Sequence, residues 1–356
     1  MIHYKSATNV VPVTVQFDTR GEEVHTWLFD KDIPPLFIEA ASSKVATIDG
    51  FVNWVKANRP SLDRLLIQHG GMVFRGFPVK TADDFNAWVA LYDQFESGYA
   101  GGATLRSKIK GNVFESTRYS ADLKIPQHQE MAYVRDYPGR IAFHCHTRAK
   151  DGGETPINDM RRLTAELPES LRMKLAERGT LVTRNFAAPP ADGSVEFSEH
   201  PDERSWKTAF YTDNADEVIQ ICADKGMEPI WNDNKSLTVR NRLDAFTKHP
   251  STGEVIYRSS IHMWSGRAYM AEDSSPTRAE RIHKMYAGQK YRSDVSLGDG
   301  SQLSADECKL INQLHDDGEI AWDWQEGDVM LLDNLIMAHG RNSFVGERLT
   351  QAALLA

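Results

Sequence analysis

The sequence predicts a mainly β fold with helical insertions, arranged as a jelly roll. Two observations favour this architecture. Segments in which apolar and polar residues alternate, as in half-buried strands, recur along the chain and bracket segments with helical spacing. In addition, side chains suited to one metal site are divided between an early strand and a late strand, and a jelly roll brings such strands side by side.

The expected organisation is a single domain over residues 1–356, because no internal repeat or linker divides the chain. A chain of this length can bury one large core. We expect the jelly-roll core at roughly residues 72–356 with a helical and hairpin insertion at roughly residues 187–320. Residues 1–71 are expected to pack on this core as strands and helices.

The N-terminal part is expected to contain, in order, a strand at 10–17, helices at 47–57 and 62–69, and a strand at 72–77. Thr81 then opens a helix in capping-box style, with Asp84 where Glu or Gln is usual. The following segment, Ser97 to Pro126, is irregular and rich in glycine and cations. It is consistent with either a lid beside a site or a surface excursion.

Strands and helices alternate in the rest of the chain. After the strand around residue 128 we expect a strand at 140–147, a helix within 159–178, a loop at 187–205 and two short helices up to residue 226. The next expected elements are a hairpin at 237–264 that turns at 249–253, helices at 275–287 and 304–316, and strands at 322–324, 329–334 and 348–355.

Composition excludes several classes of protein. The net charge of -9 argues against a general nucleic-acid binder, which would show clustered basic residues. The sequence has no apolar run of transmembrane length and no secretory signal pattern. Three widely spaced cysteines, Cys145, Cys222 and Cys308, do not form a disulfide framework. We therefore expect a cytoplasmic protein that binds neither nucleic acid nor membrane.

The strongest chemical signal is a candidate metal site. His128 and Glu130 lie two residues apart, so in a strand their side chains point to the same face. His339 is the best candidate for a third ligand. Two histidines and one carboxylate leave half of the coordination sphere open, which is the pattern of non-haem Fe(II) oxygenases. His144 and His146 have the same spacing without a nearby carboxylate, so we interpret them as sheet residues.

Wider motifs around these residues resemble the taurine dioxygenase-like (TauD/TfdA) superfamily from about Ile38 to the C-terminus. The motifs are Gln127–Glu130, Gly152–Thr155, Asp333–Arg341 and Glu347–Arg348. The resemblance implies an Fe(II)- and 2-oxoglutarate-dependent dioxygenase built on a double-stranded β-helix. Many members have Asp where this chain has Glu130, and the glutamate is similar to that of clavaminate synthase. A carboxylate at position 130 also argues against halogenation, because halogenating relatives need a vacant ligand position for chloride.

The resemblance also implies roles for individual residues. His128, Glu130 and His339 match the iron ligands, whereas Arg348 and Thr155 match the residues that bind the distal carboxylate of 2-oxoglutarate. Arg341 is a rival for the role of Arg348. The candidate contacts for an acidic substrate are Arg118, Arg258 and His262, each of which is equally consistent with a surface salt bridge, and Arg341, which either supports the site or touches the substrate.

Two segments of the insertion, 205–210 and 249–254, resemble the SyrP-type group. This likeness implies hydroxylation of the β-carbon of an amino acid, free or tethered to a carrier protein in non-ribosomal peptide and antibiotic biosynthesis. O2 and 2-oxoglutarate are the expected cosubstrates. The alternatives are desaturation, cyclisation or epoxidation with the same cofactor, or a non-catalytic cupin-like binding or regulatory protein. The cations between Arg161 and Arg178 are a candidate docking surface for an acidic carrier.

Overall fold

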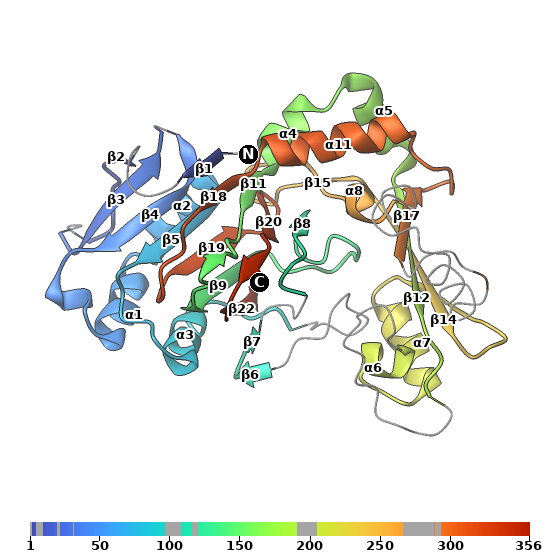
Figure 1. The fold of residues 1–356 in the computed structure, drawn as a ribbon, viewed down its shortest axis with the longest axis horizontal. Helices are drawn as coiled ribbons and strands as arrows, with labels where there is room; N and C mark the ends of the chain where they lie inside the picture. Colours follow the sequence, from blue (N-terminus) through green and yellow to red (C-terminus); the bar gives the residue numbers. More distant parts are fainter. Residues whose placement is uncertain are drawn as a thin grey trace.

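The computed structural model describes residues 2–4, 10–19, 22–30, 32–96, 108–115, 120–190, 205–265, 288 and 293–356. Its core is a pair of sheets, and a mixed insertion with its own sheet lies at the right in Figure 1. The expected mainly β fold with helical insertions is confirmed. Among the helices that the structure describes, none combines the length and apolar character needed to cross a membrane.

The larger core sheet contains strands from both ends of the chain. Its spatial order is β2 (Val10–Pro12), β3 (Val24–Phe29), β4 (Ile33–Ala40), β5 (Gly71–Arg75), β19 (Val329–Asp333), β9 (Arg140–Thr147), β22 (Leu349–Leu355), β7 (Val113–Glu115) and β6 (Lys108–Lys110). The β4–β5 pair is parallel, whereas β19 pairs with β5 and β9 in antiparallel fashion. Late strands therefore lie between early ones. β2 is shorter than the strand expected at 10–17, since it ends at Pro12.

The smaller core sheet carries the early and late segments with the candidate ligands. Its order is β1 (Ile2–Tyr4), β18 (Ile320–Trp322), β11 (Ile157–Asp159), β20 (Met337–Arg341) and β8 (Ile125–His128). Side chains of β19 alternate between two apolar clusters. Met330 and Leu332 join the cluster that includes Ile157 and Ala338 of the smaller sheet, and Leu331 joins the cluster on the opposite face. The main core therefore lies between the two sheets.

Helices cover the outer face of the larger sheet. They are α1 (Ile48–Ala57), α2 (Arg59–His69) and α3 (Ala82–Val89), preceded by the short 3-10 helix η1 (Ser43–Val45). The expected capping box of α3 is present, since the Thr81 hydroxyl accepts the Asp84 N–H and the Asp84 carboxylate accepts the Thr81 N–H. Phe85 and Trp88 are fully buried and pack toward the sheet.

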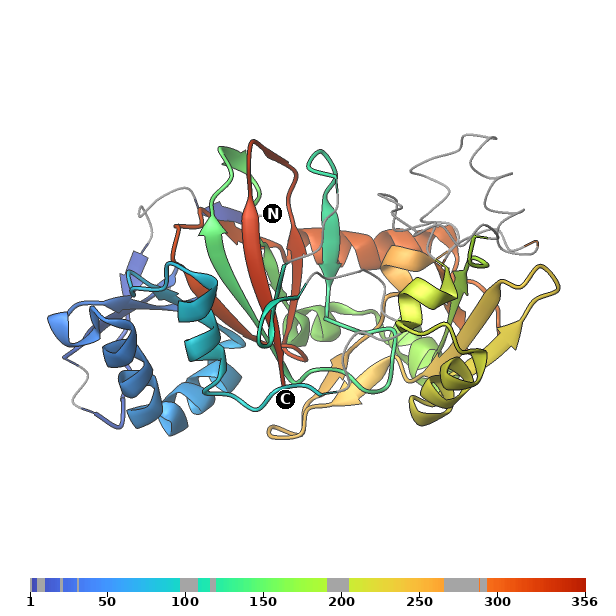
Figure 2. The ribbon, with the colours of Figure 1, turned by 90° about the horizontal axis from the view of Figure 1, so that it is seen from below.

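The insertion forms a lobe around a four-stranded sheet (Figure 2). The elements between β11 and β18, of which the first three precede the expected start of the insertion near residue 187, are α4 (Met160–Glu166), α5 (Glu169–Arg178), β12 (Thr180–Phe186), α6 (Trp206–Phe210), α7 (Ala215–Asp224), β13 (Glu228–Trp231), β14 (Leu237–Leu243), β15 (Phe246–Lys248), β16 (Val255–Tyr257), α8 (Ile261–Trp264), β17 (Ser293–Leu297) and α11 (Ala305–Asp317). The sheet order is β13-β14-β12-β17. The two short helices before residue 226 are confirmed as α6 and α7.

Two expectations in this region need correction. The helix within 159–178 is two helices, because the chain leaves the helical conformation at Leu167 before Pro168. The expected hairpin over 237–264 is wrong in its first strand, since β14 pairs with β12 and β13. Only β15 and β16 form a hairpin around residues 249–254. The helix expected at 275–287 lies outside the described residues.

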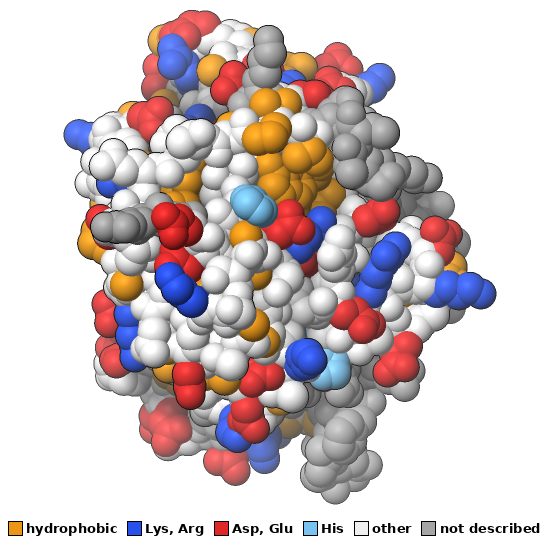
Figure 3. Space-filling model, turned by 90° about the vertical axis from the view of Figure 1, so that its left-hand side faces the viewer, with side chains coloured by type: hydrophobic (Ala, Val, Ile, Leu, Met, Phe, Trp, Pro, Cys, Tyr) orange, Lys and Arg blue, Asp and Glu red, His pale blue; other side chains and the backbone are white. Residues whose placement is uncertain are grey.

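Figure 3 shows the face at the left of Figure 1, where N-terminal strands and helices lie. Acidic and basic side chains are scattered over this face around a small apolar area. Among the side chains described on this face, positive charge is not gathered into the continuous patch that nucleic-acid binding needs.

Candidate active site

Two strands of the smaller sheet bring the candidate ligands together. His128 ends β8, and His339 is its direct partner across the β8–β20 pair. Glu130 follows two residues after His128. One ligating atom from each of these side chains lies within 4.8 Å of the others. The His339 Nε2 and Glu130 Oε2 are 3.6 Å apart, and the two imidazole centroids are 4.6 Å apart.

The donor set fits a divalent metal ion. The His128 Nδ1 lies 2.9 Å from the Pro126 carbonyl, which can only accept, so this nitrogen carries the proton and Nε2 is left for a metal. Adjacent ligand atoms at about 2.1 Å from one ion lie roughly 3 Å apart, close to the separation of His339 and Glu130. Both of these side chains are buried. Within the described residues, this is the cluster that can hold an ion.

A second group of residues surrounds Arg348, which immediately precedes β22. Its Nη2 donates to the Thr155 hydroxyl at 3.2 Å, and its Nε donates to the Gly153 carbonyl at 2.8 Å. Gly153 has a φ of +76°, and a Cβ there would lie 3.0 Å from the Arg348 Cδ and the Phe344 Cβ. Glycine at this position therefore leaves the space that the arginine side chain occupies.

Arg348 is a partly buried cation with a lowered pKa. Burial and, to a smaller extent, the nearby charge of Arg341 together lower its pKa to about 10. The guanidinium is still charged at neutral pH. A charged guanidinium in a poorly hydrated place, next to a hydroxyl donor, suits a carboxylate ligand.

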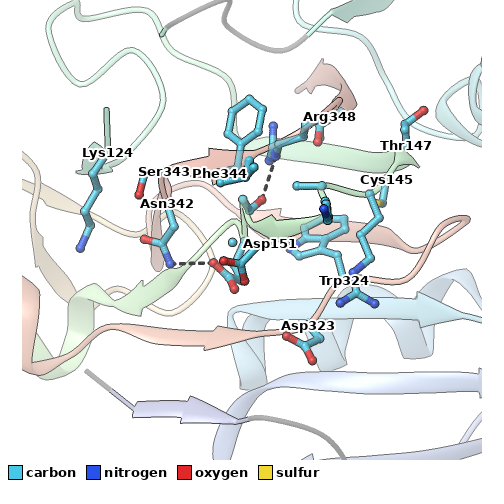
Figure 4. Close-up of a pocket in the computed structure, with 18 of the residues that line it drawn as sticks. Lys124, Cys145, Thr147, Asp151, Asp323, Trp324, Asn342, Ser343, Phe344 and Arg348 are labelled. Atoms are coloured by element: carbon cyan, nitrogen blue, oxygen red, sulfur yellow. Dashed lines mark hydrogen bonds between the residues drawn. The ribbon is translucent and has the colours of Figure 1, made fainter. Parts of the chain in front are cut away.

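A cavity of about 740 Å³ adjoins Arg348 (Figure 4). Trp324, Cys145 and Thr147 lie on the same side as Arg348 in this view, whereas Lys124 and Asn342 lie on the other side. The Asn342 amide donates to the Glu154 carboxylate at 3.0 Å. None of the three candidate metal ligands is among the residues that line the cavity, so it reaches the arginine but not the ligand cluster.

Arg341, the rival arginine, occupies a different position. Its Nη2 donates to the carbonyls of Ser120 and Leu123 at 2.6 and 2.8 Å. Its guanidinium carbon also lies 5.1 Å from the centre of the Phe344 ring. These contacts anchor the segment that leads into β8. Of the two arginines, Arg348 is the one that contacts Thr155.

The other expected substrate contacts lie beside the ligand segment. Arg258 is buried, and its Nη2 donates to the carbonyls of Met131 and Val134 at 2.8 and 3.0 Å. His262 of α8 donates from Nε2 to the Gln127 carbonyl at 2.8 Å. Both residues are buried and bond to backbone, so the surface salt-bridge interpretation is wrong for them. Arg118 lies outside the described residues.

Burial strongly affects the protonation of these groups. It lowers the pKa of His262 to about 4 and that of Arg258 to about 10. The His262 ring stacks on His315 with centroids 3.9 Å apart, and the pKa of His315 is also lowered by burial. Both imidazoles are therefore neutral near pH 7.

His144 is a core residue with an oxygen atom close to each ring nitrogen. Its Nδ1 lies 3.1 Å from the Gln351 Oε1, and its Nε2 lies 3.1 Å from the Val79 carbonyl. The neighbouring His146 lies beside the Thr147 hydroxyl. Sequence reasoning assigned no individual role to Asn334, although its side chain bonds to the Glu130 peptide. The only signal was its place in the Asp333–Arg341 motif, because the contact itself joins distant segments.

A jelly roll that carries two histidines and one carboxylate, together with a partly buried arginine bonded to a buried threonine, defines an Fe(II)- and 2-oxoglutarate-dependent dioxygenase. The family described as "Taurine catabolism dioxygenase TauD, TfdA family" matches residues 30–354, and the chain belongs to this family. The enzyme uses Fe(II) and 2-oxoglutarate, as the resemblance implied.

Two curated relatives cover most of the chain. A clavaminate synthase-like protein of Arabidopsis thaliana is 32% identical over 310 residues, which are 85% of this chain and 87% of the relative. The dapdiamide synthesis protein DdaC of Enterobacter agglomerans is 28% identical over 322 residues, which are 90% of this chain and 91% of the relative. The crystal structure of AAD-2 in complex with Mn(II) and N-oxalylglycine superposes with a TM-score of 0.50 at 10% identity. The match covers 94% of this chain and 97% of the AAD-2 chain. This last similarity concerns the fold alone.

Proposed function

We propose that this enzyme hydroxylates the β-carbon of an amino acid, free or bound to a carrier protein, in the biosynthesis of a specialised metabolite. The observation that carries the proposal is the cluster of His128, Glu130 and His339 within 4.8 Å. The relative named as a dapdiamide synthesis protein supports a role in specialised metabolism. The likeness of the insertion to the SyrP-type group supports an amino-acid substrate.

In this proposal His128, Glu130 and His339 hold Fe(II), and Arg348 with Thr155 holds the distal carboxylate of 2-oxoglutarate. Bound iron, with 2-oxoglutarate and O2, supplies the oxidant that replaces a C–H hydrogen by hydroxyl and leaves succinate and CO2. The forked guanidinium orients the ketoacid through its carboxylate, and the Thr155 hydroxyl adds one donor. The protein thus positions the reactants.

The surroundings of Arg258 support an acidic substrate. This guanidinium is buried, and its Nε has no hydrogen-bond partner among the described residues. Burial lowers its pKa, and no carboxylate among the described residues offsets this effect. A buried charge without a counter-charge is costly, and a substrate carboxylate near the Met131–Val134 turn would offset this cost.

The helices α4 and α5 give little electrostatic support for carrier docking. Every cation of the expected docking surface has a carboxylate partner. The ion pairs are Arg161–Asp159, Arg162–Glu166, Arg172–Glu169, Lys174–Glu307 and Arg178–Asp299. Charge compensation of this kind leaves little net attraction for an acidic carrier. The carrier-bound form of the substrate rests on the family likeness.

Product mass tests the proposal directly. Candidate amino acids, free and carrier-bound, are incubated with the enzyme, Fe(II), ascorbate and 2-oxoglutarate, and the intact masses and succinate are measured. Hydroxylation adds one oxygen to the substrate and releases succinate. Loss of two hydrogens would instead indicate desaturation or cyclisation, and an added oxygen on an alkene would indicate epoxidation. If no substrate or succinate turnover occurs, the non-catalytic alternative is favoured.

A further inference from the structure

The carboxamide of Asn334 bonds to both peptide groups of Glu130. Its Oδ1 accepts the Glu130 N–H at 2.7 Å, and its Nδ2 donates to the Glu130 carbonyl at 3.0 Å. The same Nδ2 donates to the Pro138 carbonyl at 2.8 Å. Asn334 is fully buried, so all three hydrogen bonds are shielded from water. The Asn334 side chain therefore holds together the first and the last residue of the 130–138 segment.

Glu130 lies outside the sheet, so the hydrogen bonds of strand pairing do not fix its backbone. β8 ends at His128, which is the last residue of this strand paired with β20. The next residue after Glu130, Met131, has a φ of +57°, an uncommon conformation for a residue with a side chain. Strand pairing thus orients His128 and His339, but it does not orient Glu130. Hydrogen bonds to the Glu130 backbone therefore help to set the direction of its carboxylate.

Asn334 is itself held in place. Its N–H donates to the Gly139 carbonyl at 2.9 Å. The preceding Asp333 accepts the Leu335 and Ile336 N–H groups through Oδ1 and bonds to the His249 Nε2 through Oδ2 at 3.0 Å. His249 belongs to the segment between β15 and β16. The carboxamide is therefore fixed by the core sheet and by the insertion, as a positioning group must be.

We propose that Asn334 is a positioning residue that sets the direction of the Glu130 carboxylate and, through it, the affinity of the metal site. The inference rests on the proposed metal role of His128, Glu130 and His339. Partners that orient a metal ligand typically contribute a factor of about 10–100 to metal affinity. Loss of the Asn334 side chain removes the two hydrogen bonds to the Glu130 backbone and the one to Pro138, so the Glu130 carboxylate samples other directions.

The test compares two buried asparagines. Asn58 is also fully buried and makes three hydrogen bonds, to Trp54 and Thr19, at the helical N-terminal end of the fold. Metal-free protein is titrated with Co(II), whose visible absorption reports its coordination, and thermal midpoints are measured in parallel. Asn334→Ala is expected to weaken Co(II) binding roughly 10–100-fold and to change the absorption. Asn58→Ala is expected to lower the thermal midpoint with unchanged Co(II) binding.

Equal Co(II) affinity in Asn334→Ala and in the unaltered chain, with a lowered thermal midpoint, would show a merely structural role and overturn the inference. If Asn334→Ala does not fold, Asn334→Leu keeps the volume of the side chain and removes the same hydrogen bonds, with Asn58→Leu as its control. His128→Ala separates the two proposals. If it binds Co(II) as tightly as the unaltered chain, the proposed metal site itself fails.

Discussion

His339 lies directly opposite His128 in the β8–β20 pair, so the register of two strands sets the separation of these two candidate ligands. A shift of one residue would turn one imidazole to the other face of the sheet. β20 is also paired on its other side, where Ile157 of β11 opposes His339. A strand held on both edges resists such slippage, which gives the two histidines a rigid foundation.

Removal of His128 should abolish metal binding and turnover together. His128→Ala leaves one imidazole and one carboxylate, which hold a divalent ion poorly. We expect a loss of metal affinity larger than the roughly 10–100-fold typical of an outer partner. Metal content after dialysis and succinate release measure the effect. His146→Ala is the control. His146 lies two residues from His144, the same spacing as between His128 and Glu130, but its ring contacts the Thr147 hydroxyl. An active, metal-containing His128→Ala would contradict the assignment.

The two arginines should differ in their effects. Arg348→Ala removes the guanidinium beside Thr155 and is expected to raise the KM for 2-oxoglutarate by roughly 30-fold or more, which corresponds to about 2 kcal/mol for a truncated buried charge pair. Arg341→Ala removes two hydrogen bonds to the segment before β8 and is expected to act mainly on the thermal midpoint. Steady-state kinetics and thermal unfolding separate the two effects. The opposite pattern would transfer the cosubstrate role to Arg341.

Gly153→Ala should displace the Arg348 side chain while leaving an arginine at position 348. The new Cβ would lie 3.0 Å from the Ala149 Cβ, the Arg348 Cδ and the Phe344 Cβ, and the φ of +76° is strained for alanine. We expect lower stability and a higher KM for 2-oxoglutarate. Gly300→Ala is a matched control, because Gly300 has a φ of +86° and no heavy atom within 4 Å of the added Cβ. An unchanged KM in Gly153→Ala would indicate that Arg348 is not displaced.

Acid should destabilise the folded state through the stacked histidines. The folded pKa of His262 is about 4, below the ordinary 6.5, because burial disfavours the charged ring. Between these pH values the unfolded chain binds more protons than the folded chain. The free energy of unfolding therefore falls as the pH falls through this window, by about 1.4 kcal/mol per pH unit for one such group. Above pH 6.5 this contribution to stability is fully present.

Denaturant unfolding at several pH values measures this dependence. His262→Gln is expected to unfold with a shallower pH slope than the unaltered chain. His25→Gln, which changes an exposed histidine, is expected to keep the original slope. Equal slopes for all three proteins would mean that the His262 ring is accessible to protons in the folded state.

Features that depend on neighbouring residues were predictable from the sequence. The capping box of Thr81 and Asp84 involves a single helical turn, and the buried positions of Phe85 and Trp88 follow from helical spacing. The convergence of His128, Glu130 and His339 was also predictable, because the jelly roll pairs an early strand with a late one. The position of Arg348 beside Thr155 was expected only from the family resemblance.

The tertiary structure alone decided which distant groups meet. The sequence pattern of β14 indicates a strand but does not specify its partner, which is why the expected hairpin was wrong. The bonds of Asn334 to Glu130 and of Arg341 to the Ser120 carbonyl join segments far apart in the chain. Local propensities reflect sterics within a few residues, whereas such contacts depend on how whole sheets pack. The sequence therefore determined the elements and the candidate ligands, and packing determined the residues that hold them in position.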